Sequence, residues 1–148
     1  SGFSSYMTQE ASTQSYYAAE SGIEHALALH KTYLEENKGA SFYHSKSGCD
    51  NDYINFDSST ADNFVCSVNP IAVQLAERDG LIEFKKNAPT YSVWVNFATT
   101  ANSVQSDRIV VLRSRGQYLN TAREIEVRFC VPSCAGIPAD DGCGGTCS

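Results

Sequence analysis

The sequence predicts an α+β fold in which one long N-terminal amphipathic helix packs on an antiparallel β-meander, followed by a disulfide-closed C-terminal tail. Three observations predict it: apolar residues spaced by three and four near the N-terminus, apolar and polar residues alternating in the second half, and six cysteines. We expect a single domain over 1–148, with a helix at 8–37, a loop region at 40–70, a sheet at 71–131 and a Cys-rich tail at 130–148.

The composition is that of an ordinary globular protein with an acidic balance. The 148 residues are 42% hydrophobic, and the formal net charge is -6. This charge has the wrong sign for binding a phosphate backbone, so we expect no nucleic-acid partner. No apolar run approaches the roughly 18 residues that would span a bilayer.

The helix is predicted because 8–37 contains no proline and its apolar residues recur on one side. Asn37, Lys38 and Gly39 supply the stop signal. A helix of this length reaches roughly 45 Å at 1.5 Å per residue, so its N-terminal end should protrude from a compact domain. His30 is expected to be packed rather than to bind a metal. The residues expected to pack against the sheet are Tyr16, Ala19, Ile23, Ala26, Leu27 and Leu34.

Residues 40–70 are rich in Ser, Asn, Asp and Gly, so they read as loops with at most one short strand. Alternation over Ile71–Leu75, with Gly80 before a second apolar run at 81–84, favours a hairpin. The alternative is a short helix that is capped by Asn69, has Pro70 at its first position and ends at Gly80.

Three strands are predicted in the second half, at 91–97, 108–115 and 124–131, the last two joined by a turn near Leu119. In the third strand, Ile125, Val127 and Phe129 alternate with charged residues, so one face of the sheet needs an apolar cover. The long helix is the element with enough apolar residues to supply that cover.

The cysteine pattern favours an oxidising compartment and disulfides. We expect a local Cys49–Cys66 bridge and two nested bridges in the tail. A four-thiolate zinc site in the tail is the alternative, although the tail lacks the Cys-x2-Cys pairs that such sites usually contain. The six cysteines are Cys49, Cys66, Cys130, Cys134, Cys143 and Cys147.

No enzyme motif is present: the sequence has no nucleophile elbow, P-loop, dinucleotide fingerprint or His-Glu-x-x-His zinc motif. We therefore expect neither catalysis nor a cofactor. Two acidic clusters are weak calcium candidates, and ordinary polar turns are the favoured explanation of both. Their residues are Asp50, Asp52 and Asp57 in one cluster and Asp140 and Asp141 in the other.

Two segments carry a resemblance to a known family. Residues 15–27, with Ala18-Ala19-Glu20-Ser21-Gly22 at their centre, resemble the helix just past the membrane-spanning part of PilX-type minor pilins and pseudopilins of type IV pili. Residues 112–127, with Ser114-Arg115-Gly116 followed by Arg123 and Glu126-Val127, resemble the final hairpin of the same family. Together the two segments cover about thirty residues and lie about a hundred residues apart.

The resemblance implies a type IV pilin-like roll and a structural subunit, a minor pilin that acts in assembly or initiation of a bacterial type IV pilus or related secretion filament. It implies other pilins or pseudopilins as partners, with Glu20 and Glu24 as subunit-interface candidates. It also implies an apolar membrane helix ahead of Phe3 that is removed from this chain. The protein would then reside in the inner membrane and periplasm before assembly and in a cell-surface filament afterwards.

The alternative is a secreted or pilus-tip adhesin, a module that binds a surface ligand through loops 40–69 and the Cys-rich tail. Aromatic side chains near acidic groups motivate it, because exposed aromatic residues on loops are typical of binding surfaces. These residues are Tyr43, Tyr53 and Phe56.

Overall fold

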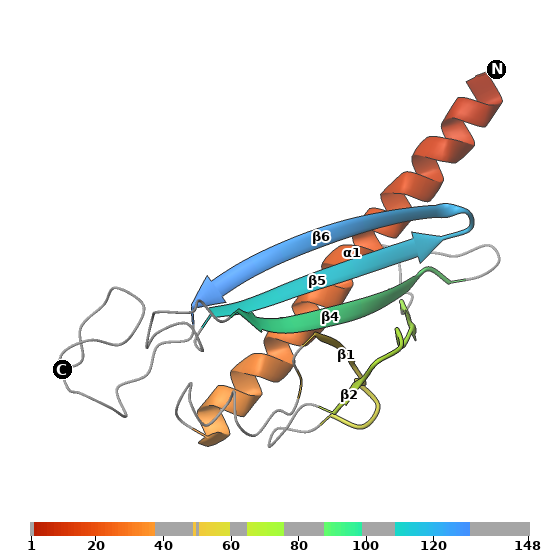
Figure 1. Ribbon diagram of the computed structural model, residues 1–148. Helices are drawn as coiled ribbons and strands as arrows, with labels where there is room; N and C mark the ends of the chain where they lie inside the picture. Colours follow the sequence, from red (N-terminus) through yellow and green to blue (C-terminus); the bar gives the residue numbers. More distant parts are fainter. Residues whose placement is uncertain are drawn as a thin grey trace.

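The chain has one helix and six strands in the computed structural model (Figure 1), which describes residues 2–37, 49, 51–59, 65–75, 88–98 and 109–130. Within the helix, side chains are described from Ala11 to Lys31. The elements are α1 (Gly2–Asn37), β1 (Asp52–Ile54), β2 (Cys66–Ser67), β3 (Val73–Gln74), β4 (Thr90–Ala98), β5 (Ile109–Tyr118) and β6 (Thr121–Cys130).

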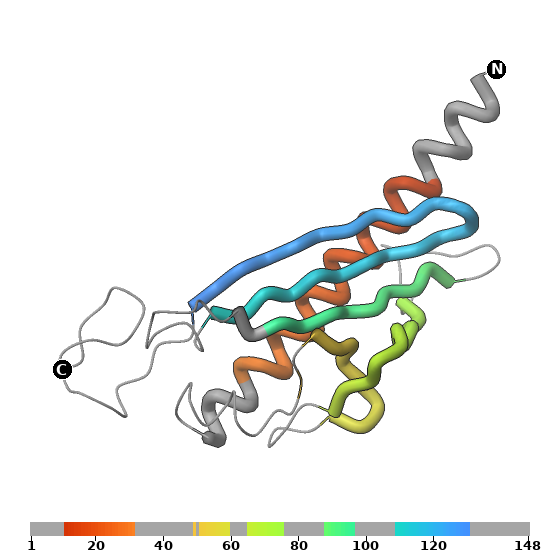
Figure 2. Tube along the Cα trace, in the orientation of Figure 1, coloured from red at the N-terminus to blue at the C-terminus, as the bar shows by residue number. Residues whose placement is uncertain are grey.

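The strands form one antiparallel sheet in the order β2-β1-β4-β5-β6, with β3 also paired to β4. Strands β1 and β3 share one edge of β4: Tyr53 pairs with Trp94, and Val73 pairs with Tyr91. The tube in Figure 2 shows both short segments alongside β4 and the long β5–β6 hairpin on its other side. Leu119, in the two-residue turn of that hairpin, has a φ of 54°.

The fold class predicted from the sequence, a pilin-like roll built on a β-meander, is wrong. The chain instead has one N-terminal helix and a six-stranded antiparallel sheet whose order departs from a meander because β1 lies beside β4. The region expected to be loops contributes β1 and β2. Strands of two or three residues are too short to leave a periodic pattern, so pairing at the open edge of β4 decides their structure.

Of the two alternatives for the segment from Ile71, the strand is confirmed over the described residues 71–75: Val73–Gln74 is a strand paired with β4, and Leu75 N donates a hydrogen bond to Pro89 O at 2.8 Å. The second half of the expected hairpin, 81–84, lies outside the described residues. Strands β4, β5 and β6 occupy the positions where alternation predicted strands. Helix α1 ends at Asn37 and begins earlier than the expected residue 8.

Helix α1 and β5 approach each other closely at two glycines. A Cβ atom on Gly116 would overlap the Ser15 carbonyl oxygen and the Ala19 backbone nitrogen. A Cβ atom on Gly22 would overlap Ser114 Oγ and lie 2.9 Å from Tyr91 Cδ2. Helix backbone leaves no space for a side chain at Gly116, so glycine is required there on sterics, whereas at Gly22 the space is filled by side chains of β4 and β5.

The buried core lies between α1 and one face of the sheet, called here the inner face (Figure 1). Alternate residues of β4 and β5 face it, and they are buried while their sequence neighbours are more exposed. Its completely or almost completely buried members from the strands include Ile54, Val93, Val95, Val110 and Leu112.

The predicted bridge between Cys49 and Cys66 is confirmed, with Cα atoms 5.6 Å apart. It joins Cys49, three residues before the start of β1, to Cys66, the first residue of β2, and Cys49 is only 2% exposed. Cys130 at the end of β6 is also disulfide-bonded. The remaining predicted tail bridges, and the tail from 131 onward, lie outside the described residues.

Replacing Gly116 by Ala is expected to lower the free energy of unfolding by about 3 kcal/mol, because the added methyl group must displace helix backbone. Strand propensity alone predicts the opposite sign, since Gly weakens strand interiors. Urea unfolding measures the change. Ser114→Ala on the same strand removes a buried hydroxyl that has no hydrogen-bond partner among the described residues, so it should cost nothing. Equal stability of Gly116→Ala and wild type would contradict the close contact.

Opening the Cys49–Cys66 bridge by the double substitution to Ala is expected to cost about 3 kcal/mol, because the unfolded chain regains loop entropy. Thermal or urea unfolding under non-reducing conditions gives the value. The matched control is Val68→Ala beside the bridge, where the side chain is 81% exposed and the change should stay within about 0.5 kcal/mol. A double variant as stable as the control would show that the bridge does not stabilise the fold.

Candidate functional site

The side of α1 that packs on the sheet carries smaller side chains than the predicted apolar stripe. Ala19, Ile23 and Ala26 are buried, whereas Tyr16 and Leu27 are 43% and 39% exposed. The cause is the close approach to β5, which leaves space only for small side chains along the contact. The side chain of Leu34 lies outside the described residues.

Sequence reasoning missed the small residues that make this contact. Ala11, Ser15 and Ala18 are 6%, 0% and 0% exposed, and Ser15 Oγ donates a hydrogen bond to the Ala11 carbonyl at 2.6 Å. The spacing of four from Ala11 through Ser15, Ala19 and Ile23 was a detectable signal. It was outweighed by the larger aromatic and aliphatic residues on the other side of the helix.

The contact joins the two sequence segments that carry the family resemblance. Gly22 and Ala19 belong to the first segment, and Ser114 and Gly116 belong to the second. The segments are far apart in sequence, but the fold brings these four residues together. Residues of the two segments therefore pack against each other where α1 contacts β5.

The two predicted subunit-interface carboxylates differ in their surroundings. Glu24 is exposed, and Glu20 is partly buried. A hydrogen bond to Glu20 raises the pKa of the Tyr16 phenol above its usual range, so Glu20 already has one partner on its own helix. At 100° per residue, Tyr16, Glu20, Glu24 and Leu27 fall within about 80° of the helix circumference. We call these four residues the outer helix stripe.

A second cluster surrounds His25 beside the inner face. Its ring stacks on Phe56 with centroids 3.9 Å apart, and its Nδ1 lies within hydrogen-bond distance, 2.8 Å, of the Tyr91 hydroxyl. Partial burial lowers the pKa of His25 and raises that of Tyr91. The adhesin hypothesis expected Phe56 to be exposed for ligand binding. Phe56 is instead packed against the helix.

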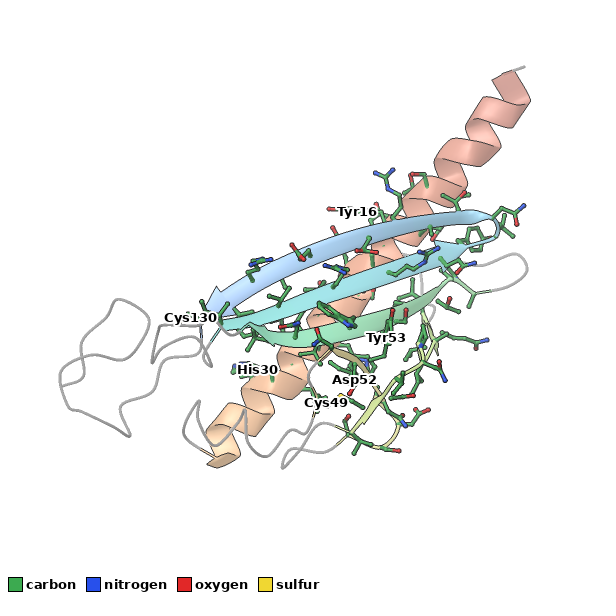
Figure 3. All side chains as sticks on the ribbon, viewed as in Figure 1. Tyr16, His30, Cys49, Asp52, Tyr53 and Cys130 are labelled. Carbon is green, nitrogen blue, oxygen red and sulfur yellow. A yellow bond between two sulfur atoms is a disulfide. The ribbon has the colours of Figure 1, made fainter. Side chains whose placement is uncertain are left out.

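His30 is packed within the core, as predicted: it is 5% exposed and its ring meets the Phe129 ring edge-on at 4.8 Å. Figure 3 labels it on α1, below the end of β6 that carries Cys130. Burial lowers the pKa of His30 to about 4, so the imidazole is neutral in the folded protein at neutral pH.

The other face of the sheet, called here the outer face, carries a groove of about 480 Å³. This outer-face groove is lined by aromatic, polar and charged side chains from β1, β4, β5 and β6: Tyr53, Thr90, Tyr91, Ser92, Trp94, Arg113, Arg115, Gln117 and Glu124. Pro70 and Ala72, which lead into β3, form its far wall. Figure 3 shows Tyr53, the labelled member, beside β4. Tyr43, which the adhesin reading grouped with Tyr53, lies outside the described residues.

A charge network forms part of the outer-face groove, because Arg113 and Glu124 line it. Arg113 Nε lies 3.1 Å from Glu124, and its Nη2 lies 3.1 Å from Glu126. Arg128 lies 3.7 Å from the same Glu126, and the Arg113 guanidinium also stacks over Trp94 at 4.7 Å. Two arginines and two glutamates make this network neutral, and solvent exposure of its members limits its contribution to stability.

The calcium candidates are not brought together in the described part of the chain. Asp52 pairs with Val95 in the sheet, and Asp57 lies in an exposed turn in which Asn55 O accepts hydrogen bonds from Ser58 N and Ser59 N. No group of three or more His, Cys, Asp or Glu side chains suited to a metal occurs among the described residues. Asp50, Asp140 and Asp141 lie outside them.

Comparisons of the chain with protein-family models, curated proteins and solved structures found no significant match. Within the described residues, no helix combines the length and apolarity needed to cross a membrane.

The free energy of unfolding is expected to decrease as the pH is lowered below about 6.5, because of His30. The unfolded chain binds a proton at His30 near pH 6.5, whereas the folded chain binds it only near pH 4. Between these values the unfolded state holds more protons, so the free energy of unfolding decreases as the pH falls, by up to about 3 kcal/mol. Above pH 6.5 this contribution does not change. Urea unfolding at pH 7, 5.5 and 4 measures it.

The matched variant for this measurement is His30→Leu, which keeps the buried volume apolar and removes the titrating group. Its stability should decline less over the same range, because His25 and the carboxylates are unchanged. Identical pH dependence of the variant and wild type would contradict the account of His30.

Proposed function

We propose that the protein is a structural, non-enzymatic subunit of a bacterial type IV pilus or related secretion filament, acting in assembly or initiation as a minor pilin. The observation that carries the proposal is the meeting of the two resembling segments, since Gly22 and Gly116 occupy one contact. The contact ties the two resembling segments to one specific packing of helix against strand.

The arrangement of α1 gives further support. In Figure 1 the N-terminal end of the helix continues beyond the edge of the sheet. A helix that extends past its own domain offers a surface to neighbouring subunits, and repeated head-to-tail contacts of this kind build a filament. The proposed partners are other pilins or pseudopilins. The proposed location is the inner membrane and periplasm before assembly, and a cell-surface filament afterwards.

The outer helix stripe is the surface we assign to subunit contact. Tyr16 and Leu27 are exposed although both are large and apolar, and Tyr17 beside them is 45% exposed. Exposed apolar groups bordered by charged residues are typical of interaction sites. Glu20 and Glu24 supply the charges, so a neighbouring subunit with basic residues would fit this stripe.

The direct test is to delete the gene in the native bacterium and count surface filaments by electron microscopy, with the intact gene returned on a plasmid as control. The proposal expects fewer filaments or lost filament-dependent secretion, and recovery on complementation. It also expects the protein in the sheared filament fraction by mass spectrometry. Unchanged filaments and secretion, together with absence from that fraction, would contradict it.

Charge reversal on the outer helix stripe should impair assembly without unfolding the domain. Glu24→Lys is exposed and is expected to reduce filament number severalfold, while the thermal midpoint of the purified domain changes little. Asp57→Lys makes the same charge change in an exposed turn away from the stripe and should assemble normally. Equal filament numbers for Glu24→Lys and Asp57→Lys would remove Glu24 from the interface.

A further inference from the structure

The outer-face groove contains one cation that the charge network leaves unused. Arg113 is held by Glu124 and Glu126, and Arg128 by Glu126. Arg115 pairs across the strands with Glu124, yet that carboxylate bonds Arg113 instead. In the described part of the chain Arg115 has no ion-pair partner, and it is exposed on the groove wall.

We propose that the outer-face groove binds an acidic saccharide, a pyranose ring that carries a carboxylate. The site is separate from the outer helix stripe, because α1 lies on the inner face, so the inference does not depend on filament assembly. It also places ligand recognition on the sheet instead of the tail.

Three features of the groove match this ligand. The Arg115 guanidinium presents a planar set of donors that fits a carboxylate in bidentate fashion. Tyr53, paired with Trp94 across β1 and β4, offers its ring to the C–H face of a sugar, and the Arg113 guanidinium covers one face of Trp94. Thr90, Ser92 and Gln117 supply donors and acceptors for ring hydroxyls. A volume of about 480 Å³ lies within the range of small-ligand sites, roughly 300–1,000 Å³.

The chemistry of the groove argues against other ligand classes. A polyanion such as nucleic acid needs several free cations, whereas Arg115 is the unpaired one here and the chain carries a net charge of -6. A purely apolar ligand would leave the polar groups of Arg115, Gln117 and Ser92 without partners. One carboxylate with several hydroxyl groups satisfies both constraints.

The single tryptophan of the chain, Trp94, lies in the groove, so its fluorescence reports binding without a label. The full chain is titrated with methyl β-glucuronide and, as the matched neutral sugar, methyl β-glucoside. We expect the Trp94 fluorescence to change saturably with the glucuronide, with a dissociation constant in the millimolar range. The glucoside should bind at least about tenfold more weakly. Raising the salt concentration should weaken binding of the glucuronide and leave binding of the glucoside unchanged.

Arg115→Gln should lower glucuronide affinity about tenfold, to the level of the glucoside, and leave glucoside binding unchanged. Arg128→Gln, an exposed arginine on the same face outside the groove lining, should bind the glucuronide like wild type. Thermal midpoints of both variants are measured to confirm folding. The proposal is overturned by absence of a saturable change, by equal affinity for the two sugars, or by wild-type binding in Arg115→Gln. A response to an acidic peptide but not to the glucuronide would also overturn it.

Discussion

The architecture depends on one contact, the close approach of the α1 backbone to β5. At Gly116 of β5, the helix carbonyl of Ser15 occupies the space where a Cβ atom would lie. At Gly22 of α1, the Ser114 side chain of β5 occupies the corresponding space. Because the helix lies this near, only small residues such as Ala18 and Ala19 fit between the two elements. The larger Tyr16 and Leu27 are turned outward. The same constraint therefore explains both the buried contact and the exposed stripe that we assign to subunit contact.

The two faces of the sheet acquire different properties from this contact. On the inner face α1 completes a core with Val93, Val95 and Leu112, and His30 is held neutral by its burial. On the outer face the alternate residues of β4 and β5 remain accessible, and short β1 and β3 add a wall along the edge of β4. A structural role for the inner face and a recognition role for the outer face can thus coexist in one small domain.

The sequence could predict the features that leave strong or local signals. Helix α1 followed from its length without proline, β4 to β6 from alternation, and the Cys49–Cys66 bridge from its short spacing. Alternation over Ile71–Leu75 also predicted the strand that contains β3, whereas β1 and β2 could not be predicted, because such short segments are placed by pairing with neighbouring strands. The sequence also could not predict which side of α1 faces the sheet, since this depends on how closely the helix approaches β5. The outer-face groove gathers Tyr53, Trp94 and Arg115 from three strands, and only the register brings them together.

Amide hydrogen exchange measured by NMR tests the central contact most directly. If α1 and β5 share one packed unit, the amides of Ala18, Ala19 and Ala26 exchange at the same free energy as those of Val110 and Leu112, through global unfolding. In Gly116→Ala both sets should lose protection together. Exchange of the helix amides at a much lower free energy than the β5 amides would mean that the helix opens independently of the sheet, and would contradict the account.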